Sequence, residues 1–161
     1  KAIEQKPKDV EAYYNLGSAY FDKGVFDSAI TAFDKTIQIN PEYRPAYSLL
    51  GIAYTKVGKY DDAIQILKKR IEFDPDLAIA HSNLGIVYSM KGMDKEALTA
   101  YNKALEIDPG HAINAFQTAV MSDPNNVEIY NDLGTAYKAK GMEKDAEGYF
   151  SIYKKKTKKG K

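Results

Sequence analysis

The apolar side chains near the start of the chain recur at intervals of three and four residues. Between residues 11 and 23 they fall at Tyr13, Leu16 and Tyr20, with mostly polar or small residues between them. This spacing places them on one face of an α-helix, so a helix with one buried side is predicted here. Gly17 lies on the same side. Because a glycine inside a helix costs roughly 1 kcal/mol relative to alanine, its presence indicates close contact with a neighbouring helix.

A second helix with one buried face is predicted over residues 26–39. Its apolar face consists of Ala29, Ile30, Phe33 and Ile37. Gly24 precedes this helix, where a residue in the left-handed conformation would end the first one. Pro41 follows the second helix and cannot extend it. The pattern therefore predicts a helix–turn–helix unit.

This unit repeats along the chain, and its first three copies are 34 residues apart. The recurring positions are Leu16-Gly17, Leu50-Gly51, Leu84-Gly85 and Leu133-Gly134; Tyr20, Tyr54, Tyr88 and Tyr137; Gly24, Gly58, Gly92 and Gly141; Ala29, Ala63, Ala97 and Ala146; and Pro7, Pro41, Pro75 and Pro109. One such unit cannot bury its apolar face alone, but stacked neighbours bury a continuous core. The repeat therefore indicates a solenoid of helix pairs.

These residues resemble the tetratricopeptide repeat (TPR) family, whose pattern is aromatic-x-x-Leu-Gly-x-x-Tyr followed by Gly, Ala, aromatic, Ala and Pro at fixed offsets. The first repeat matches it at Tyr13, Leu16, Gly17, Tyr20, Gly24, Ala29, Phe33 and Pro41. The resemblance extends over nearly the whole chain. It implies an all-α fold, a right-handed superhelical solenoid of antiparallel helix pairs, with a concave groove lined by the first helices.

The repeat register divides the chain into segments. The predicted segments are residues 1–9, the end of a truncated repeat; 10–43, 44–77 and 78–111, three complete repeats; 112–126, a second helix alone; 127–153, the last repeat; and 154–161, a basic Lys-rich tail. We expect the last helix to run from Glu143 to about Lys155. No further amphipathic helix follows to cover its end, so no cap is predicted.

The register breaks after Pro109. The next proline, Pro124, follows at less than half of the spacing that separates Pro75 from Pro109. One first helix and its turn are therefore missing near Gly110-His111-Ala112. Either the printed sequence omits an unresolved stretch of the natural chain, or the protein has a second helix without a partner. We favour an omitted stretch, because a lone helix cannot bury both of its faces.

The charge is unevenly distributed. The net charge of the chain is +1, but the tail carries six Lys, so the rest of the chain has a net charge near −5. This tail fits a solvated, disordered end, and a contact with an anionic membrane or with nucleic acid is the alternative. Because no aromatic residue interleaves the Lys run, we expect no nucleic-acid partner and membrane contact only through the tail.

The composition excludes several classes of site. The chain contains no Cys, which rules out disulfides, thiolate zinc sites and a cysteine nucleophile, and which is compatible with a reducing compartment such as the cytoplasm. No apolar run approaches the length of a membrane span, and no signal peptide is visible. The chain starts at Lys1 without a Met, so we expect the natural N-terminus to be missing.

No catalytic constellation is apparent, so we expect no enzymatic activity, no cofactor and no metal site. His81 occupies the slot of Tyr13 in the first repeat and is predicted to pack between helices, while His111 lies in a different repeat. Arg70 stands where the family has a small residue. We expect its stem to pack and its charged head to reach water.

The candidate binding site is the set of first-helix residues that lie off the packing stripe. The peptide-binding residues predicted for the concave face are Tyr14, Asn15, Ser18, Phe21, Leu49, Ile52, Lys56, Asn83, Ile86, Met90, Asn131 and Thr135. Exposed apolar side chains in a groove favour a ligand. The resemblance implies that Asn15 and Asn83 occupy a position where some family members grip a peptide backbone, a ladder that Leu49 interrupts here.

The resulting hypothesis is a non-catalytic protein–protein interaction scaffold that binds a peptide or protein segment in the concave groove. One family mode, a carboxylate clamp for acidic chaperone tails, is not expected, because the first and third repeats lack the required inner Lys, Asn and Arg residues. Two alternatives stay open: a self-assembling structural module that associates through its repeat ends, and the repeat region of a larger enzyme or transport complex.

Overall fold

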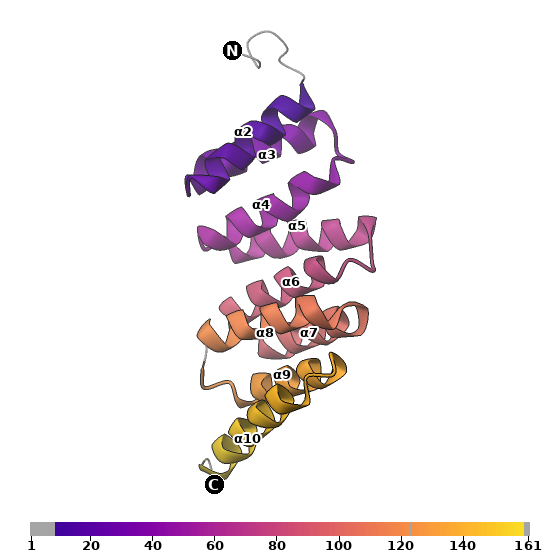
Figure 1. Cartoon of the computed structure of the whole chain (residues 1–161). Helices are drawn as coiled ribbons and strands as arrows, with labels where there is room; N and C mark the ends of the chain where they lie inside the picture. Colours follow the sequence, from indigo (N-terminus) through magenta and orange to yellow (C-terminus); the bar gives the residue numbers. More distant parts are fainter. Residues whose placement is uncertain (1–8, 123, 160–161) are drawn as a thin grey trace. The chain divides into compact units, whose positions relative to one another are not determined.

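The computed structural model describes residues 9–122 and 124–159, and these residues fold into α-helices joined by short turns (Figure 1). The chain divides after Pro75 into two compact units, residues 1–75 and 76–161. Unit 1 contains α2 (Val10–Asp22), α3 (Phe26–Ile39), α4 (Arg44–Lys56) and α5 (Tyr60–Phe73). The helix predicted over residues 11–23 therefore begins and ends one residue earlier, as α2. The helix predicted over residues 26–39 is confirmed at both ends, as α3.

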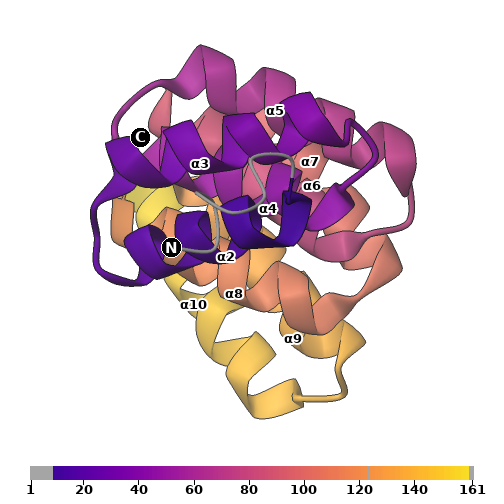
Figure 2. The same cartoon turned by 90° about the horizontal axis from the view of Figure 1, so that it is seen from above.

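In unit 1 the helices pack in chain order. The α2 helix packs on α3, α3 packs on α4, and α4 packs on α5, while α2 and α4 also touch (Figures 1 and 2). Unit 1 is thus two helix pairs stacked side by side, as the repeat predicts.

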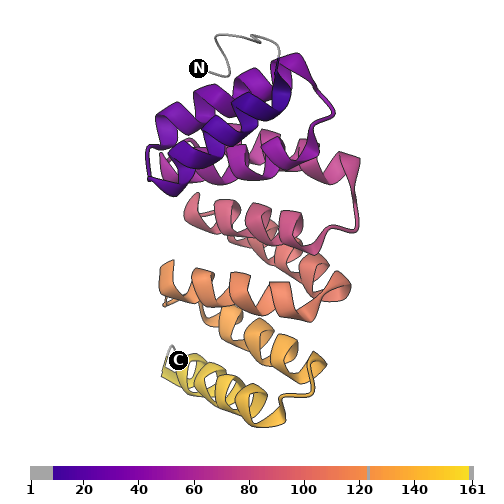
Figure 3. The same cartoon turned by 45° about the horizontal axis from the view of Figure 1, so that its top comes forward.

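Unit 2 contains α6 (Ala78–Met90), α7 (Asp94–Ile107), α8 (Pro109–Ser122), α9 (Val127–Ala139) and α10 (Glu143–Lys159). Two helix pairs, α6–α7 and α9–α10, resemble those of unit 1. The α8 helix has no partner of its own and packs against α6, α7 and α9 (Figure 3). No described helix is both long and apolar enough to cross a membrane.

Each first helix ends in the same turn. Gly24 has a φ of 73°, the Val25 N–H donates to the Tyr20 carbonyl at 2.9 Å, and the Gly24 N–H donates to the Phe21 carbonyl at 2.9 Å. This is the Schellman arrangement, which satisfies carbonyls that the helix end leaves free. Gly58, Gly92 and Gly141 have φ values of 77°, 76° and 75° and end their helices in the same way. The predicted role of these glycines is confirmed.

Gly17 lets a side chain from the paired helix reach the backbone. A Cβ atom placed on Gly17 would lie 2.6 Å from Cε1 of Phe33, closer than real Cβ contacts come. The equivalent pairs are Gly51 with Leu67 at 2.7 Å, Gly85 with Tyr101 at 2.5 Å and Gly134 with Phe150 at 2.6 Å. The close contact inferred from the mid-helix glycine is therefore confirmed.

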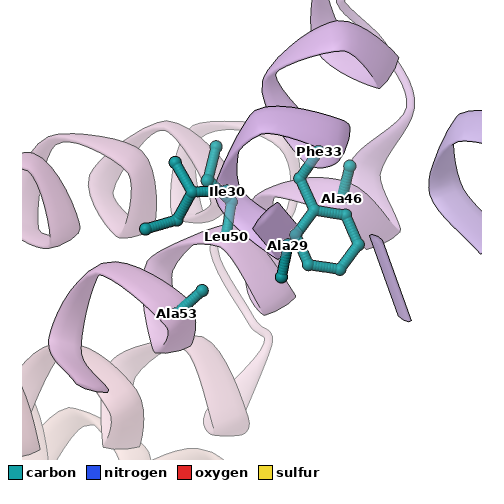
Figure 4. Close-up of a cluster of buried hydrophobic side chains, with 6 residues drawn as sticks. All are labelled: Ala29, Ile30, Phe33, Ala46, Leu50 and Ala53. Carbon is teal, nitrogen blue, oxygen red and sulfur yellow. The ribbon is translucent and has the colours of Figure 1, made fainter. Parts of the chain in front are cut away.

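The core of unit 1 forms where α3 meets α4. The side chains buried there are Ala29, Ile30, Phe33, Ala46, Leu50 and Ala53 (Figure 4). Small alanines face large aliphatic and aromatic side chains, which allows the helices to approach closely. Burial of a large apolar side chain contributes about 1.5–3 kcal/mol, so Phe33 and Leu50 are main sources of stability here.

Tyr101 fills the position of Phe33 in unit 2, but it brings a hydroxyl into the core. The side chain is fully buried, and its hydroxyl has no hydrogen-bond partner among the described residues. Burial raises the pKa of the Tyr101 phenol. The Ser89 side chain opposes this rise, but it lies outside hydrogen-bonding geometry to the phenol. This hydroxyl is therefore a destabilising element of unit 2.

A single residue, Asp108, joins α7 to α8. Its N–H donates to the Ala104 carbonyl at 2.8 Å, while its carboxylate accepts the Gly110 N–H at 2.7 Å and lies 2.8 Å from Nδ1 of His111. These bonds lower the pKa of Asp108, the His111 contact first. An Asp cap followed by Pro109 is a strong helix start. The helix therefore begins at Pro109, and the boundary predicted at residue 112 is three residues late.

The α8 helix has the apolar face of a second helix, but it has no first helix of its own to pair with. Phe116 is fully buried, and its ring centroid lies 4.9 Å from that of Tyr101 on α7. Contacts with α6 and α7 therefore replace the missing partner. Whether the natural chain contains a further first helix and turn here stays a prediction.

Two expectations about charged side chains are wrong. The Arg70 side chain is only 11% exposed, its Nη2 lies 3.9 Å from Oδ2 of Asp74, and its Nε and Nη1 are buried without a partner among the described residues, so most of its head is enclosed instead of extending into water. The Lys-rich tail was expected to be disordered, but it continues α10 as a helix up to Lys159. The tail is helical because Lys has a high helix propensity and can extend a helix that has already formed.

Candidate protein-interaction site

In unit 1 the predicted binding residues lie on α2 and α4. We call the set Tyr14, Asn15, Ser18, Phe21, Leu49, Ile52 and Lys56 the inner face. Asn15 and Lys56 are exposed, and the other five are half-buried. Since α2 and α4 are in contact, one molecule can touch residues from both helices.

The aromatic residues of the inner face are held by other rings. The ring of Tyr14 lies 5.9 Å from that of Phe33 and 5.1 Å from that of Tyr43. Phe21 makes an edge contact with Phe26 at 5.4 Å. Such contacts fix ring orientation, so these side chains serve the fold and leave only part of their surface for a ligand.

The remaining inner-face residues differ in how much of each side chain is available to a ligand. The Ser18 hydroxyl donates to the Tyr14 carbonyl at 3.0 Å, so its donor is already used. Leu49 packs against the core of unit 1, and both Leu49 and Ile52 are half-buried. The exposed amide of Asn15 can both donate and accept hydrogen bonds. The face thus combines an aliphatic strip with one free amide and one ammonium group.

In unit 2 the predicted residues are not brought together. Asn83 and Ile86 are half-buried on α6, where Met90 is 42% exposed, whereas Asn131 and Thr135 lie on α9. Among the described residues α8 contacts both α6 and α9, which do not contact each other. The continuous groove expected from the repeat is therefore interrupted in unit 2, because α8 lies where the next first helix would pack.

The α8 helix also covers the residue of α6 that precedes the predicted groove residue Asn83. Ser82 on α6 is 4% exposed, and its hydroxyl donates to the His111 carbonyl at 3.4 Å. At the far end of α8 the side chain of Met121 is 85% exposed. The helix therefore buries part of the expected surface and adds a surface of its own.

Asp132 has an unusual environment on α9. It holds the repeat position of Asn15 and Asn83 and is half-buried. Burial, together with the nearby Glu128 carboxylate, raises its pKa to about 6, while a hydrogen bond from Asn131 acts in the opposite direction. The repeat position of Asp132 can be read from the sequence, but its pKa depends on burial by neighbouring helices, which sequence does not give.

Unit 1 also has a cavity of about 620 Å³ between α2 and α3. Its lining includes Tyr13, Leu16 and Tyr20, which the sequence analysis treated only as packing residues. The equivalent residues Tyr47 and Leu50 on α4 are buried. The α3 helix covers that part of α4, so the α2 face is one that a preceding helix could cover.

On α4, where another helix covers the equivalent face, the Tyr hydroxyls form hydrogen bonds. On α4 the Tyr47 hydroxyl donates to the Pro41 carbonyl at 2.6 Å, and the Tyr54 hydroxyl donates to Asp34 at 3.3 Å. Burial, and then the Asp34 charge, raises the pKa of Tyr54 to about 12, so it stays protonated. The Tyr hydroxyls on this face therefore have acceptors on the covering helix or in the turn that follows it.

A polar cavity of about 490 Å³ lies between α8 and α9. Its lining includes Asp108, His111, Gln117 and Lys140, and the Gln117 amide donates to the Tyr137 hydroxyl at 2.8 Å. The acid and the imidazole are already paired with each other. Among the described residues no three His, Asp or Glu side chains are grouped so as to hold a metal ion.

The fold and surface define a helical repeat protein of the protein-interaction class. Residues 10–43 and 78–111 match the model of the tetratricopeptide repeat, and residues 53–92 match that of the TPR repeat. The chain belongs to the tetratricopeptide repeat family. TPR arrays act as interaction scaffolds, and this is the class of function that the chain has. No curated protein sequence matches the chain significantly.

Solved structures with the same fold include two of MamA. One is 26% identical with a TM-score of 0.61, and the match covers 99% of this chain and 84% of MamA. The other is 27% identical with a TM-score of 0.59, covering 93% and 92%. YrrB, a TPR protein with an unusual peptide-binding site, has a TM-score of 0.56 at 19% identity, with 96% and 72% covered. At that identity the likeness to YrrB concerns the fold alone.

Proposed function

We propose that the inner face of unit 1 binds an extended peptide segment of a partner protein. The observation that carries this proposal is the half-buried aliphatic strip of Leu49 and Ile52 on α4, together with the exposed amide of Asn15 at the position of the adjoining α2 that corresponds to Leu49. Aliphatic side chains of a peptide would pack on the strip. The amide can donate to a peptide carbonyl and accept from a peptide N–H, so it would bind the backbone whatever the sequence.

Two further features support an extended ligand with an acidic residue. Tyr14 and Phe21 are fixed by ring contacts, so binding would cost little side-chain entropy. Lys56 is exposed at the end of α4 and would attract a carboxylate. The proposal includes no catalytic step. Like YrrB, whose described site binds peptide, the chain would act by holding a segment.

The test uses peptides selected from a random library displayed on phage. We expect selected peptides to lose at least about tenfold in affinity when Leu49 and Ile52 are both replaced by Glu, because a buried aliphatic contact becomes a charged one. The control pair Gln65→Glu and Lys68→Glu changes exposed residues of α5. Circular dichroism checks that helicity is kept. Peptides that bind the inner-face variant as tightly as the wild type would refute the proposal.

A second candidate, self-association, has one observation in its favour. The α2–α3 face presents half-buried Tyr13, Leu16 and Tyr20 beside a 620 Å³ cavity, so two copies could cover each other there. Light scattering over a concentration range, with the variant Leu16→Glu as control, tests this. A strict monomer at all concentrations excludes it. Membership in a larger enzyme or transport complex also stays a prediction, which the full open reading frame decides.

A further inference from the structure

The last helix carries its Lys residues as an ordered surface. The α10 helix spans Glu143–Lys159, and the side chains of Lys144, Lys155 and Lys158 are exposed along it. No Asp or Glu occurs in the sequence after Glu147. The part of the helix after Glu147 therefore has a positive potential that no carboxylate of its own offsets, whereas Lys144 in the first turn lies beside Asp145.

Lys156 fixes which side of α10 faces outward. Its Nζ donates to the Pro124 carbonyl at 3.0 Å and lies 5.2 Å from the ring centroid of Tyr130 on α9. Lys156 is therefore half-buried, unlike the Lys residues beside it. Because one turn of the helix is attached to the rest of unit 2 in this way, the other Lys side chains keep a defined direction.

An apolar side chain lies among these charges. We call Lys144, Gly148, Ile152, Lys155 and Lys158 the terminal basic face, because their spacing places them along one side of α10. Ile152 is 38% exposed at its centre. It lines two shallow hollows, one of about 260 Å³ beside Gly148 and one of about 510 Å³ beside Lys155.

The first hollow owes its space to a missing side chain. Gly148 lies inside a helix, yet a Cβ atom added to it would meet nothing within 4 Å. Helix packing thus does not require this glycine, in contrast to Gly134 on α9. The open space beside Ile152 is large enough for an aliphatic side chain from outside.

This end of unit 2 is poorly suited to a further repeat. On α3 the residues packed toward the next helix include the buried Ile30 and the half-buried Ile37. The equivalent residues of α10 are Glu147 and Lys154, and both are exposed. A charged residue at such positions makes stacking of another helix pair unfavourable, so α10 acts as a polar cap. Whether a separate element covers this end stays a prediction.

We propose that the terminal basic face binds an acidic segment of a partner protein, with an aliphatic side chain of that segment placed against Ile152. Carboxylates would pair with the exposed Lys155 and Lys158, while the aliphatic side chain fills a hollow. This surface is separate from the inner face of unit 1.

The surface fits a protein segment better than a membrane or a nucleic acid. A membrane would require several apolar side chains on the exposed side of the helix, whereas this face has only Ile152. Single-stranded nucleic acid would require a free aromatic ring. Tyr149, which lines the first hollow, is already stacked on Tyr137 at 5.2 Å and an angle of 11°.

The experiment measures fluorescence anisotropy of a labelled Glu-rich synthetic peptide that carries one central Leu. For the variant Lys155→Glu, Lys158→Glu we expect a loss of about tenfold or more in affinity, because two attractions become repulsions. The control Lys68→Glu, Lys95→Glu changes the net charge equally at exposed residues of α5 and α7. It should change the affinity less than about twofold, since neither residue belongs to the terminal basic face and salt screens exposed charges that do not pair with the peptide.

A second pair of measurements separates a built site from nonspecific charge attraction. Replacing the central Leu of the peptide with Ser should weaken binding to the wild type and leave binding to Ile152→Ser unchanged. Replacing Lys155 and Lys158 with Gln removes the attraction without adding repulsion, so the loss of affinity should be smaller than with Glu. Three outcomes overturn the proposal: equal effects of the two charge-reversal pairs, no coupling between the Leu and Ile152, and tighter binding of single-stranded DNA or phosphatidylserine vesicles than of the peptide.

Discussion

Replacing Gly85 with Ala tests the close packing within each helix pair. A Cβ at this position would lie 2.5 Å from Cδ1 and from Cε1 of Tyr101, which is itself fully buried and has no space to move into. Over-packing of a core costs about 1–3 kcal/mol. Alanine regains about 1 kcal/mol of helix propensity. Because the Tyr101 ring is enclosed, we expect the upper part of that range and a net loss of about 1–2 kcal/mol.

Gly148→Ala is the matched control. It also replaces a helix-interior glycine, but its Cβ would meet nothing within 4 Å. We therefore expect a gain of about 1 kcal/mol from propensity alone. The two substitutions add the same methyl group and should change stability in opposite directions, since only one of them is opposed by a neighbouring ring.

Urea unfolding followed by circular dichroism, with hydrogen exchange of the α6 and α7 amides, measures both effects. A change of 1 kcal/mol corresponds to about 2–4 °C in Tm for a chain of this size. The double variant Gly85→Ala, Tyr101→Ala should be less destabilised than the sum of its parts by at least about 0.5 kcal/mol, because the clash is gone. A neutral or stabilising Gly85→Ala would refute the account of the repeat glycines.

Three further substitutions and one analysis of the natural chain test other features. Asp132→Asn should stabilise unit 2 by about 1 kcal/mol at pH 7, a value discounted for partial exposure, and have no effect near pH 4. The pKa of Asp132 is raised to about 6 in the folded state from 3.8, so its ionisation lowers stability as pH rises between those values. Tyr101→Phe should stabilise the chain by about 1 kcal/mol by removing a buried hydroxyl without a partner. Arg70→Met should stabilise it by about 1–2 kcal/mol, because two buried guanidinium nitrogens lack partners. The intact mass of the natural protein should exceed that of the printed sequence by one first helix and its turn.

Each of these has a distinct contrary outcome. A pH profile of Asp132→Asn parallel to that of the wild type would show that this carboxyl does not titrate as described. If Ser89→Ala destabilised the wild type but not Tyr101→Phe, the phenol would have a partner in Ser89. The exposed Lys69→Met is the control for Arg70→Met and should change stability by less than about 0.5 kcal/mol. An intact mass equal to that of the printed sequence would mean that α8 truly lacks a first helix.

The sequence predicted most of the local structure because the relevant forces act over a few residues. The helix at Phe26–Ile39 and the glycine turns after each first helix follow from apolar periodicity and from the left-handed conformation that glycine accepts. Gly17 was linked to a close helix contact, and the structure identifies Phe33 as the side chain that requires it. In each repeat the mid-helix glycine and the large side chain that packs against it are separated by the same number of residues.

The errors concern residues whose state depends on neighbours far away in the sequence. The head of Arg70 was expected in water and is mostly enclosed, and the residues beyond Lys155 were expected to be disordered and are helical up to Lys159. The groove was expected to continue across unit 2 from Asn83 to Asn131, and α8 lies between them. None of these follows from periodicity, because periodicity specifies which face of a helix is apolar and not which helix covers it.

The sequence by itself thus determined the family, the helix pairs and the residues that could face a ligand. Tertiary structure decided which of those residues remain available: the α2 and α4 residues share one surface in unit 1, whereas α8 separates their counterparts in unit 2. It also decided that Asp132 is buried enough to titrate near 6 and that Lys156 orients the basic side of α10. The physical reason is that burial and charge interactions depend on distances in space, which helices remote in the chain set jointly.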